Sequence, residues 1–344
     1  MPANRMQCGQ ATAMAGIFAP HCPACRLRGV ASALETEAWD ATSGQGVLLC
    51  AVCEARYPVL DHLPLLVPDV ARYLAEAGVY LLARDDLTYA VADLIGGVLP
   101  PGSWFDAVRQ HLSGYVRDHW ADAGDDDAPP PGQSAALAAT GLALAGEVAG
   151  PVVELGAAAG GVTRYLAERL DAPVLGLDLS APLARFAMRA LRGGRQAFPL
   201  RMAGTAYAER HVVTQPPSRG TATVWLADAT VPPIADGAAG LVVALNLIDC
   251  VADPGAVLRG AAALLRPGGK LVLATPCDWS PAATPPEMWI GARRGALAAP
   301  DLGTWAEAQG GLRLLGMKQQ SWLVRVHSTA TMQYRALVMA LEKI

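Results

Sequence analysis

The sequence predicts an α/β fold, in which a Rossmann-like, doubly wound sheet follows a small N-terminal metal-binding module. Short apolar runs recur between residues 152 and 275, and each ends in a polar residue or a turn. Such runs are typical of parallel strands that are buried on both faces. The first run leads into the small-residue loop 154–160 and then into a helical segment. Near the N-terminus, four cysteines form two Cys-x-x-Cys pairs, which indicate a separate metal-binding module.

The apolar runs give the positions of the expected strands along the chain. Ligands of open α/β sheets bind at the C-terminal ends of the strands, so the polar residues that end these runs are candidate site residues. A helix is expected over 254–265, and two glycines at 193–194 together with the segment 215–220 predict an irregular insertion before the third strand. The segments expected as strands are 152–155, 174–178, 224–228, 241–246, 266–275, 320–326 and 331–341.

The loop after the first strand carries a motif. Glu154-x-Gly156-x-Ala158-x-Gly160, with Asp178 ending the next run, resembles the first motif and the ribose-binding acid of class I S-adenosylmethionine (SAM) methyltransferases. The resemblance covers about residues 135–344 and includes the Arg-Pro-Gly-Gly turn at 266–269. It implies a seven-stranded sheet in the order 3-2-1-4-5-7-6, with an antiparallel last strand and SAM as the cofactor.

The resemblance also implies roles for single residues. Glu154 is expected at the methionine end of SAM, Asp178 at both ribose hydroxyls, and Asp228 at the adenine amino group. For both aspartates, an interpretation as acids that only cap a loop stays open. Ala158 stands where the family more often has glycine, and an unstrained loop then requires a negative φ at this position. The expected cofactor residues are Glu154, Gly156, Ala158, Gly160, Asp178, Leu179, Asp228, Ala229 and Asn246.

The two cysteine pairs are Cys22-Pro-Ala-Cys25 and Cys50-Ala-Val-Cys53. Two such knuckles can close a tetrahedral structural zinc site, whereas the alternative is a redox dithiol beside an unrelated pair. With the following segment, residues 20–70 resemble the zinc-ribbon module that activates several RNA and protein methyltransferases. His62 is expected to be a surface or packing residue, because four cysteines already complete the ligand set.

Four regions are expected along the chain. Within the helical region, Tyr115 and His119 lie one turn apart and are interpreted either as part of a substrate lid or as a face packed on the ribbon. The regions are a zinc ribbon at 1–70, a helical connector at 71–120, a flexible acidic and proline-rich linker at 121–133, and the methyltransferase domain at 134–344.

The acceptor is predicted from the segment after the fourth strand. Asn246-x-x-Asp249 resembles the pair that holds the acceptor imidazole in protein histidine N-methyltransferases, because a carboxylate that accepts the imidazole N–H fixes the tautomer. The alternative is that Asn246 frames the cofactor through its backbone and Asp249 caps the next helix. Trp279 and Trp289 are candidates for an aromatic wall around a flat acceptor.

Charge and length limit the function classes. A net charge of −4 and a pI near 5.9 give no basic footprint for nucleic acid. A peptide, protein or small-molecule acceptor is therefore favoured over rRNA or tRNA, and a non-catalytic binding scaffold is the third possibility. No apolar stretch is long enough to span a membrane, so a cytoplasmic protein is expected, of unpredicted oligomeric state.

Overall fold

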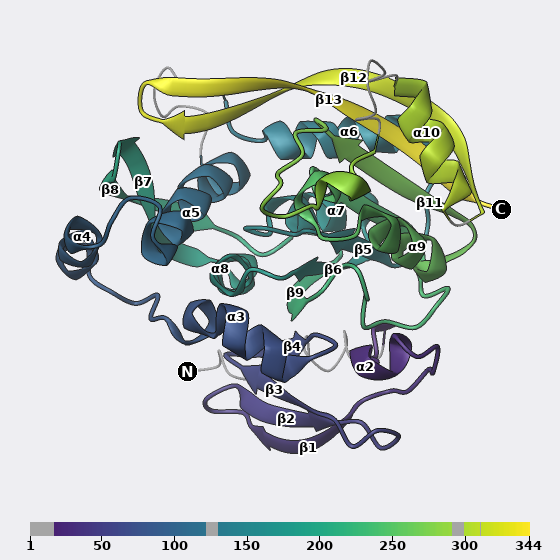
Figure 1. Ribbon diagram of the computed structural model, residues 1–344, viewed down its shortest axis with the longest axis horizontal. Helices are drawn as coiled ribbons and strands as arrows, with labels where there is room; N and C mark the ends of the chain where they lie inside the picture. Colours follow the sequence, from purple (N-terminus) through teal and green to yellow (C-terminus); the bar gives the residue numbers. More distant parts are fainter. Residues whose placement is uncertain (1–16, 122–129, 291–298, 310) are drawn as a thin grey trace.

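The computed structural model describes residues 17–121, 130–290, 299–309 and 311–344 (Figure 1). Seven strands run in the order β9-β6-β5-β10-β11-β13-β12, which is the predicted order 3-2-1-4-5-7-6. The five strands from β9 to β11 in this order are parallel to their neighbours, whereas β13 is antiparallel to β11. The strands are β5 (Val152–Leu155), β6 (Pro173–Asp178), β9 (Thr221–Ala227), β10 (Ala239–Leu245), β11 (Leu265–Thr275), β12 (Leu312–His327) and β13 (Ala330–Lys343).

Helices cover both faces of this sheet, because apolar side chains of β5 and β6 point to each face and are buried there. Val152 and Val174 pack with Leu166 on the face of α6 and α7, whereas Val153 and Leu175 pack on the opposite face with α9 and α10. The helices are α6 (Gln133–Ala145), α7 (Gly161–Leu170), α8 (Ala181–Arg192), α9 (Pro254–Leu264) and α10 (Ala299–Ala308), with short 3-10 turns η1 (Ile248–Cys250) and η2 (Pro286–Met288).

The insertion before the third strand is regular, which corrects the expectation of an irregular segment. Strands β7 (Gly194–Ala203) and β8 (Ala206–Thr214) form an antiparallel hairpin outside the main sheet. Phe198, Leu200 and Val212 are buried in alternation with more exposed neighbours, and this period-two pattern is the sequence signal of a strand.

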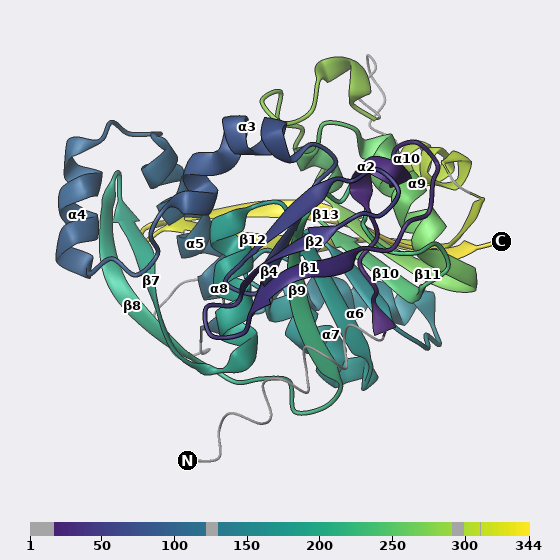
Figure 2. The same cartoon turned by 90° about the horizontal axis from the view of Figure 1, so that it is seen from below.

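The N-terminal module extends the main sheet. Its strands β1 (Glu35–Asp40), β2 (Gln45–Leu49), β3 (Arg56–Leu60) and β4 (Leu63–Leu66) are antiparallel to one another, after the short helix α2 (Pro23–Arg26). Strand β4 then pairs in parallel with β9, so that the sheet has eleven strands. Figure 2 shows this module lying along the β9 side of the sheet.

Three helices join the module to the rest of the chain: α3 (Val70–Leu82), α4 (Tyr89–Val98) and α5 (Trp104–Trp120). Most of the expected linker, residues 122–129, lies outside the described residues. Across the described ranges, none of the helices combines the length and apolar character needed to span a bilayer.

Candidate active site

The small-residue loop after β5 is fixed by backbone hydrogen bonds. The N–H groups of Gly156 and Ala157 donate to the carbonyl of Leu177 at 2.8 and 3.0 Å. Ala158 has φ +45°, so the expectation of a negative φ at this position is wrong. In this left-handed conformation, the Ala158 N–H donates a hydrogen bond to Asp178 Oδ2 at 2.7 Å.

Asp178 and Asp228 both make loop-capping contacts. Asp178 also accepts from the Ser180 N–H at 2.8 Å, while Asp228 accepts from the N–H and hydroxyl of Thr230 at 2.8 and 2.7 Å. Burial raises the pKa of Asp178, and the backbone N–H groups oppose that rise. A carboxylate has about four acceptor positions, so these contacts leave capacity for a ligand.

Leu179 and Ala229 follow these two acids. The Leu179 side chain is exposed and its carbonyl accepts a hydrogen bond from the Tyr73 hydroxyl of α3 at 3.1 Å. Ala229 is buried. Helix α3 is therefore attached to the loop that follows β6.

Glu154 is the next-to-last residue of β5 and is only 2% exposed. It accepts a hydrogen bond from the Thr163 hydroxyl at 2.5 Å. Burial, assisted by repulsion from Asp178, raises the pKa of Glu154 to about 8. Ionisation of the Glu154 carboxyl would stabilise a positively charged group placed beside it.

The end of α5 packs on the same loop. Trp120 Nε1 donates to the Ala159 carbonyl at 2.7 Å, and His119 Nδ1 accepts from the Gly161 N–H at 3.1 Å. Burial lowers the pKa of His119, which keeps the ring neutral and its Nδ1 lone pair available to that N–H. His119 thus contacts the N-terminus of α7, whereas Tyr115 lines a cavity on the other side.

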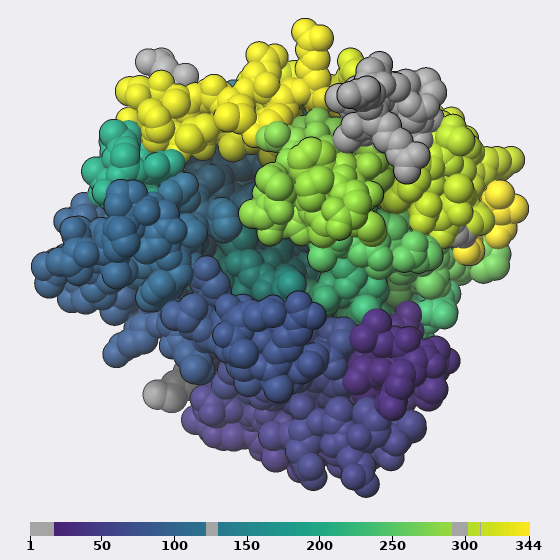
Figure 3. Space-filling model, in the orientation of Figure 1, coloured from purple at the N-terminus to yellow at the C-terminus, as the bar shows by residue number. Residues whose placement is uncertain are grey.

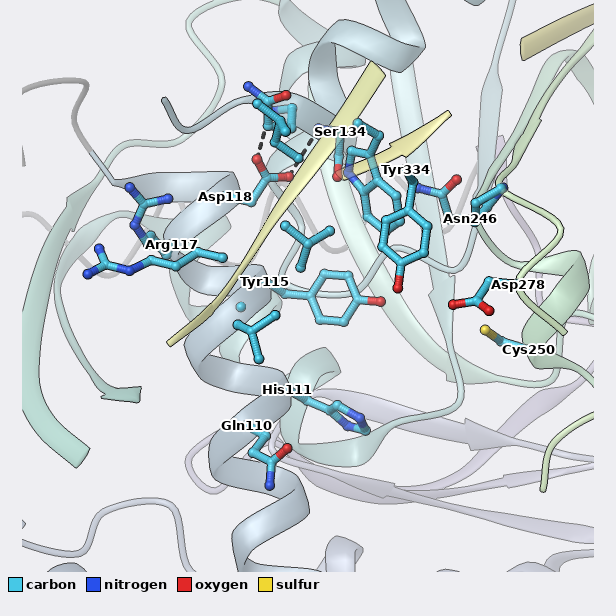
Figure 4. Close-up of a pocket in the computed structure, with 18 of the residues that line it drawn as sticks. Gln110, His111, Tyr115, Arg117, Asp118, Ser134, Asn246, Cys250, Asp278 and Tyr334 are labelled. Carbon is cyan, nitrogen blue, oxygen red and sulfur yellow. Dashed lines mark hydrogen bonds between the residues drawn. The ribbon is translucent and has the colours of Figure 1, made fainter. Parts of the chain in front are cut away.

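This cavity has a volume of about 320 Å³ and lies between α5, the residues after β10 and β11, and the β12–β13 hairpin. Figure 3 shows a hollow on this face, bordered by the blue helical region, the lime segment after β11 and the yellow hairpin. Asn246, Asp249 and Tyr115 all line the cavity (Figure 4). The other expected cofactor residues do not line it.

Asn246 and Asp249 each present a buried oxygen without a hydrogen-bond partner among the described residues. Asp249 is 2% exposed, and its Oδ2 accepts from the Asp278 N–H at 2.9 Å while Oδ1 is the unpartnered atom. Burial raises the pKa of Asp249, and the Asp278 charge adds to the rise. Asn246 has φ +51°, and its N–H donates to the Ala274 carbonyl at 2.7 Å.

The alternative role of Asp249 as a helix cap is wrong. Helix α9 is capped by Asp253, whose Oδ1 accepts from the Ala256 N–H at 2.9 Å. Asp249 lies in the short turn η1 before it. Its carboxylate is therefore held at the cavity by Asp278 rather than used at the start of the helix.

The two tryptophans lie outside the cavity lining. Trp289 Nε1 donates to the Thr284 carbonyl at 2.8 Å, and the Thr284 hydroxyl donates to the Val251 carbonyl at 2.7 Å. The Trp289 hydrogen bond thus joins two positions within the segment after β11, and the Thr284 hydroxyl joins that segment to Val251. Trp279 Nε1 is buried without a partner among the described residues.

Several cavity residues have no counterpart in the sequence prediction. Trp322 and Tyr334 are opposite each other on β12 and β13 and stack with ring centroids 5.1 Å apart. Burial and a hydrogen bond to Asp278 raise the pKa of Tyr334, and Figure 4 shows its hydroxyl pointing toward Asp278 and Cys250. Each of the two strands contains a single Phe, Tyr or Trp residue, so no pattern in the sequence pointed to this wall.

The four predicted metal ligands form a second site. The Sγ atoms of Cys22, Cys25, Cys50 and Cys53 all lie within 4.8 Å of one another, with Cys22–Cys53 and Cys25–Cys50 separations of 3.6 and 3.7 Å. A zinc–sulfur bond of about 2.3 Å in a tetrahedron corresponds to sulfur atoms about 3.8 Å apart. The cluster is therefore compatible with zinc.

Donors from nearby residues surround these sulfur atoms. The Tyr57 hydroxyl lies 3.1 Å from Cys22 Sγ, and the Ser32 hydroxyl lies 3.1 Å from Cys50 Sγ. Arg28 donates to Cys25 Sγ at 3.4 Å. Such contacts stabilise thiolate ligands and orient them.

A strand order of 3-2-1-4-5-7-6 with a glycine-containing loop after the first strand defines a mixed α/β fold of the class I methyltransferase type. The methyltransferase domain family matches residues 132–324, which is more than half of the chain. The chain therefore belongs to the methyltransferase domain family. No curated protein matches the chain.

Solved structures with a similar fold include a putative methyltransferase from Bacillus halodurans, at 13% identity and a TM-score of 0.39, covering 61% of this chain and 99% of that one. A SAM-dependent methyltransferase from Methanosarcina mazei has 13% identity, a TM-score of 0.41 and coverages of 59% and 96%. A structure concerned with conversion of a disulfide bond into a thioacetal group during echinomycin biosynthesis has 18% identity, a TM-score of 0.44 and coverages of 70% and 91%.

Proposed function

We propose that the chain is a SAM-dependent N-methyltransferase that acts on an imidazole-like nitrogen of a peptide, protein or small molecule. The observation that carries the proposal is the buried Asp249 carboxylate in the cavity wall, with one oxygen held by the Asp278 N–H and the other without a partner among the described residues. A buried, unpartnered acceptor is costly. An acceptor molecule with an N–H group would satisfy it.

The order of polar residues along the sheet fits SAM. Asp228, Asp178, Glu154 and Asn246 lie at the C-terminal ends of strands that are neighbours in the order β9-β6-β5-β10. An extended ligand along this edge would place adenine near Asp228, ribose near Asp178 and the cationic methionine end near Glu154. The sulfonium and α-amino group are positively charged, so they would favour ionisation of the buried Glu154 carboxyl and lower its pKa from the raised value of the ligand-free chain. Asn246 would then lie where the cofactor meets the acceptor cavity.

The proposed reaction depends mainly on the alignment of the acceptor nitrogen with the methyl group. SAM supplies a methyl group on a sulfonium, which a neutral nitrogen lone pair can attack in line. Asp249 Oδ1 would accept the N–H of the acceptor ring, fix its tautomer and direct the other nitrogen toward the methyl group. After transfer the ring is cationic, and the raised pKa of Asp249 suits it to receive the N–H proton. Alignment of this kind can contribute roughly 7 to 11 kcal/mol.

We also propose that Cys22, Cys25, Cys50 and Cys53 bind one structural zinc ion. Their sulfur spacing and the donors from Tyr57, Ser32 and Arg28 support it. Four protein ligands leave no position open for water. The metal would therefore stabilise the N-terminal module and take no part in methyl transfer.

Replacement of Asp249 by asparagine tests the acceptor site. Asp249→Asn keeps the size of the side chain but presents an N–H where an acceptor is needed, so we expect turnover to fall on the order of a hundredfold or more. Affinity for S-adenosylhomocysteine should stay within about twofold, because Asp249 contacts the acceptor. The assay is S-adenosylhomocysteine release with histidine-containing peptides, imidazole compounds and rRNA fragments, and calorimetry reports cofactor binding.

Asp253→Asn is the matched control, since Asp253 is a nearby acid that caps α9; it should retain turnover. An unchanged rate for Asp249→Asn on the true substrate, or methylation of RNA but of no imidazole, would contradict the proposed acceptor. A wild-type chain that binds neither SAM nor S-adenosylhomocysteine would contradict the methyltransferase activity itself and favour a binding scaffold.

A further inference from the structure

The cavity at the proposed acceptor site has an acidic end. Asp249 and Asp278 both line the cavity, and they come after the neighbouring strands β10 and β11. The Asp278 N–H donates to Asp249 Oδ2 at 2.9 Å, so the two acids lie side by side on one wall. Among the residues that the structure describes, neither acid forms an ion pair. Two adjacent acids without a cation repel each other, and a positively charged ligand would relieve this repulsion.

The charge of these acids reaches neighbouring groups on three elements. Burial and the charges of Asp249 and Asp278 raise the pKa of the Cys250 thiol in η1 to about 11. Burial raises the pKa of Tyr334 on β13, and a hydrogen bond with Asp278 and the charges of both acids add to the rise. Burial also raises the pKa of Tyr115 on α5, with a contribution from Asp249. This end of the cavity is therefore negatively charged when the acids are ionised.

Aromatic rings from three elements line the same cavity: Tyr115 from α5, Trp322 from β12 and Tyr334 from β13. Trp322 and Tyr334 stack with ring centroids 5.1 Å apart. Figure 4 shows the hydroxyls of Tyr115 and Tyr334 pointing toward the side of the cavity where Asp278 lies. The face of an aromatic ring attracts a cation that lies within about 6 Å of the ring centroid. The rings and the acids therefore favour the same kind of ligand, a cation.

The basic side chains of the cavity lining are not paired with these acids. Figure 4 shows Arg117 and Asp278 on opposite sides of Tyr115. Arg201 donates to a carbonyl in the β7–β8 turn at 2.7 Å, and Arg325 donates to carbonyls that follow it at the end of β12. A cationic ligand is therefore expected at the acidic end, beside the residues that follow β10 and β11.

We infer that the acceptor is a compact cationic amine, with an ammonium group close to its nucleophilic nitrogen. This inference rests on the proposed function, because Asp249 Oδ1 holds the N–H of the acceptor ring. Asp278 binds the ammonium group, and Tyr115 and Tyr334 contact it with their rings. The two acids are adjacent, so a short chain between the ring and the ammonium group is sufficient. The cavity volume of about 320 Å³ is in the range of small-molecule sites.

The experiment measures binding of matched probes to the full chain by calorimetry, in the presence of S-adenosylhomocysteine and at about pH 8.5, where an amine is charged and imidazole is largely neutral. Histamine carries an ammonium group, and 4-propylimidazole has a methyl group in its place. We expect histamine to bind on the order of tenfold more tightly. Asp278→Asn removes the charge but keeps the backbone N–H that holds Asp249. It should reduce this preference to within about twofold and leave S-adenosylhomocysteine affinity unchanged.

Glu287→Gln is the matched control, since Glu287 is an exposed acid in the same segment after β11 and does not line the cavity; its preference should equal that of the wild type. Equal binding of the two imidazoles, or an unchanged preference in Asp278→Asn, would overturn the inference, while binding of 4-propylimidazole would leave the imidazole acceptor standing. A parallel loss of S-adenosylhomocysteine affinity in Asp278→Asn would assign Asp278 to the amino group of the cofactor and overturn the inference too.

A second pair of probes without imidazole separates the inference from the proposed acceptor. 2-Phenylethylamine carries an ammonium group, and 2-phenylethanol has a hydroxyl in its place. Tighter binding of the amine, lost in Asp278→Asn, in a chain that binds neither imidazole would support the ammonium site and contradict the imidazole acceptor. Binding of none of the four probes would overturn the inference.

Discussion

Ala158 shows how a single residue can depart from local preference. Its φ of +45° lies in the left-handed region, which costs an alanine roughly 1 to 2 kcal/mol relative to glycine. The hydrogen bond from its N–H to Asp178 at 2.7 Å offsets part of this cost. The sequence showed that alanine replaces glycine here, but the sign of φ depends on a contact with the next strand and could not be predicted locally.

Glu154 should make the stability of the ligand-free chain depend on pH. Its pKa rises from 4.5 in the unfolded chain to about 8 in the folded one, so the folded state holds a proton that the unfolded state releases between these values. The free energy of unfolding should therefore fall as pH rises from about 4.5 to about 8. Glu154→Gln should lack this contribution, so its melting temperature relative to the wild type should rise by several degrees across that range.

Glu287→Gln is the control for this series, because Glu287 is exposed in η2 and its substitution should leave the pH profile unchanged. The measurement is the melting temperature of both variants and the wild type at matched ionic strength. Parallel profiles for Glu154→Gln and the wild type would show that Glu154 is ionised in the folded state.

Helix α5 connects the proposed cofactor loop with the proposed acceptor cavity. Its last turn places His119 and Trp120 on the loop, while Gln110 and Tyr115 line the cavity from the preceding turns. The helical spacing of Tyr115 and His119 correctly places them on one helix, with ring centroids 6.0 Å apart. Their different partners depend on how α5 crosses α7, which sequence spacing does not specify.

Gly161 is the contact that should be most sensitive to substitution between these two helices. A Cβ atom at Gly161 would lie 2.5 Å from His119 Cβ and 2.8 Å from His119 Cα, so the backbone of α5 would have to move. We expect Gly161→Ala to lower the free energy of unfolding by about 1 to 3 kcal/mol, as is typical of overpacking. Denaturant unfolding monitored by tryptophan fluorescence measures this change.

The matched control is Gly97→Ala in α4, where an added Cβ meets nothing within 4 Å. This substitution should be neutral or stabilise the chain by up to about 1 kcal/mol through helix propensity. Equal effects of the two substitutions would mean that α5 can shift away from α7 at no cost.

At the scale of the whole molecule, the sequence predicts the parts that depend on local pattern. The positions of the strands, the helix before β11 and the cysteine cluster follow from apolar runs, turn residues and ligand spacing, whereas the order of the strands in the sheet was implied by the resemblance to class I methyltransferases; the structure contains all four. The proposed acceptor cavity could not be predicted in the same way, because Asn246 and Asp249 share it with residues from α5, β7 and the β12–β13 hairpin. Those elements are distant in sequence, and their contacts leave no local periodicity.

The junction between the N-terminal module and the catalytic sheet is another non-local feature. Strand β4 pairs with β9 through Leu65 with Leu226 and Leu66 with Ala227, and Asp228 follows directly. Leu66 also belongs to the buried cluster that includes Cys22, Cys25 and Cys50. The predicted adenine site is therefore adjacent in the chain to a strand that the proposed zinc module supports.

Removal of zinc should consequently affect the cofactor site as well as the N-terminus. The chain should contain about one zinc per molecule when prepared without chelator, and Cys53→Ser or chelation should increase hydrogen exchange in β1 to β4 and in β9. Loss of the β4 contact should loosen the loop at Asp228 and weaken S-adenosylhomocysteine binding on the order of tenfold. Cys277→Ser, which changes a cysteine outside the cluster, should retain the metal, the exchange pattern and the affinity. Full cofactor affinity in a zinc-free chain would show that the module and the catalytic sheet are energetically independent despite the shared sheet, and absence of zinc in the untreated protein would reject the metal site.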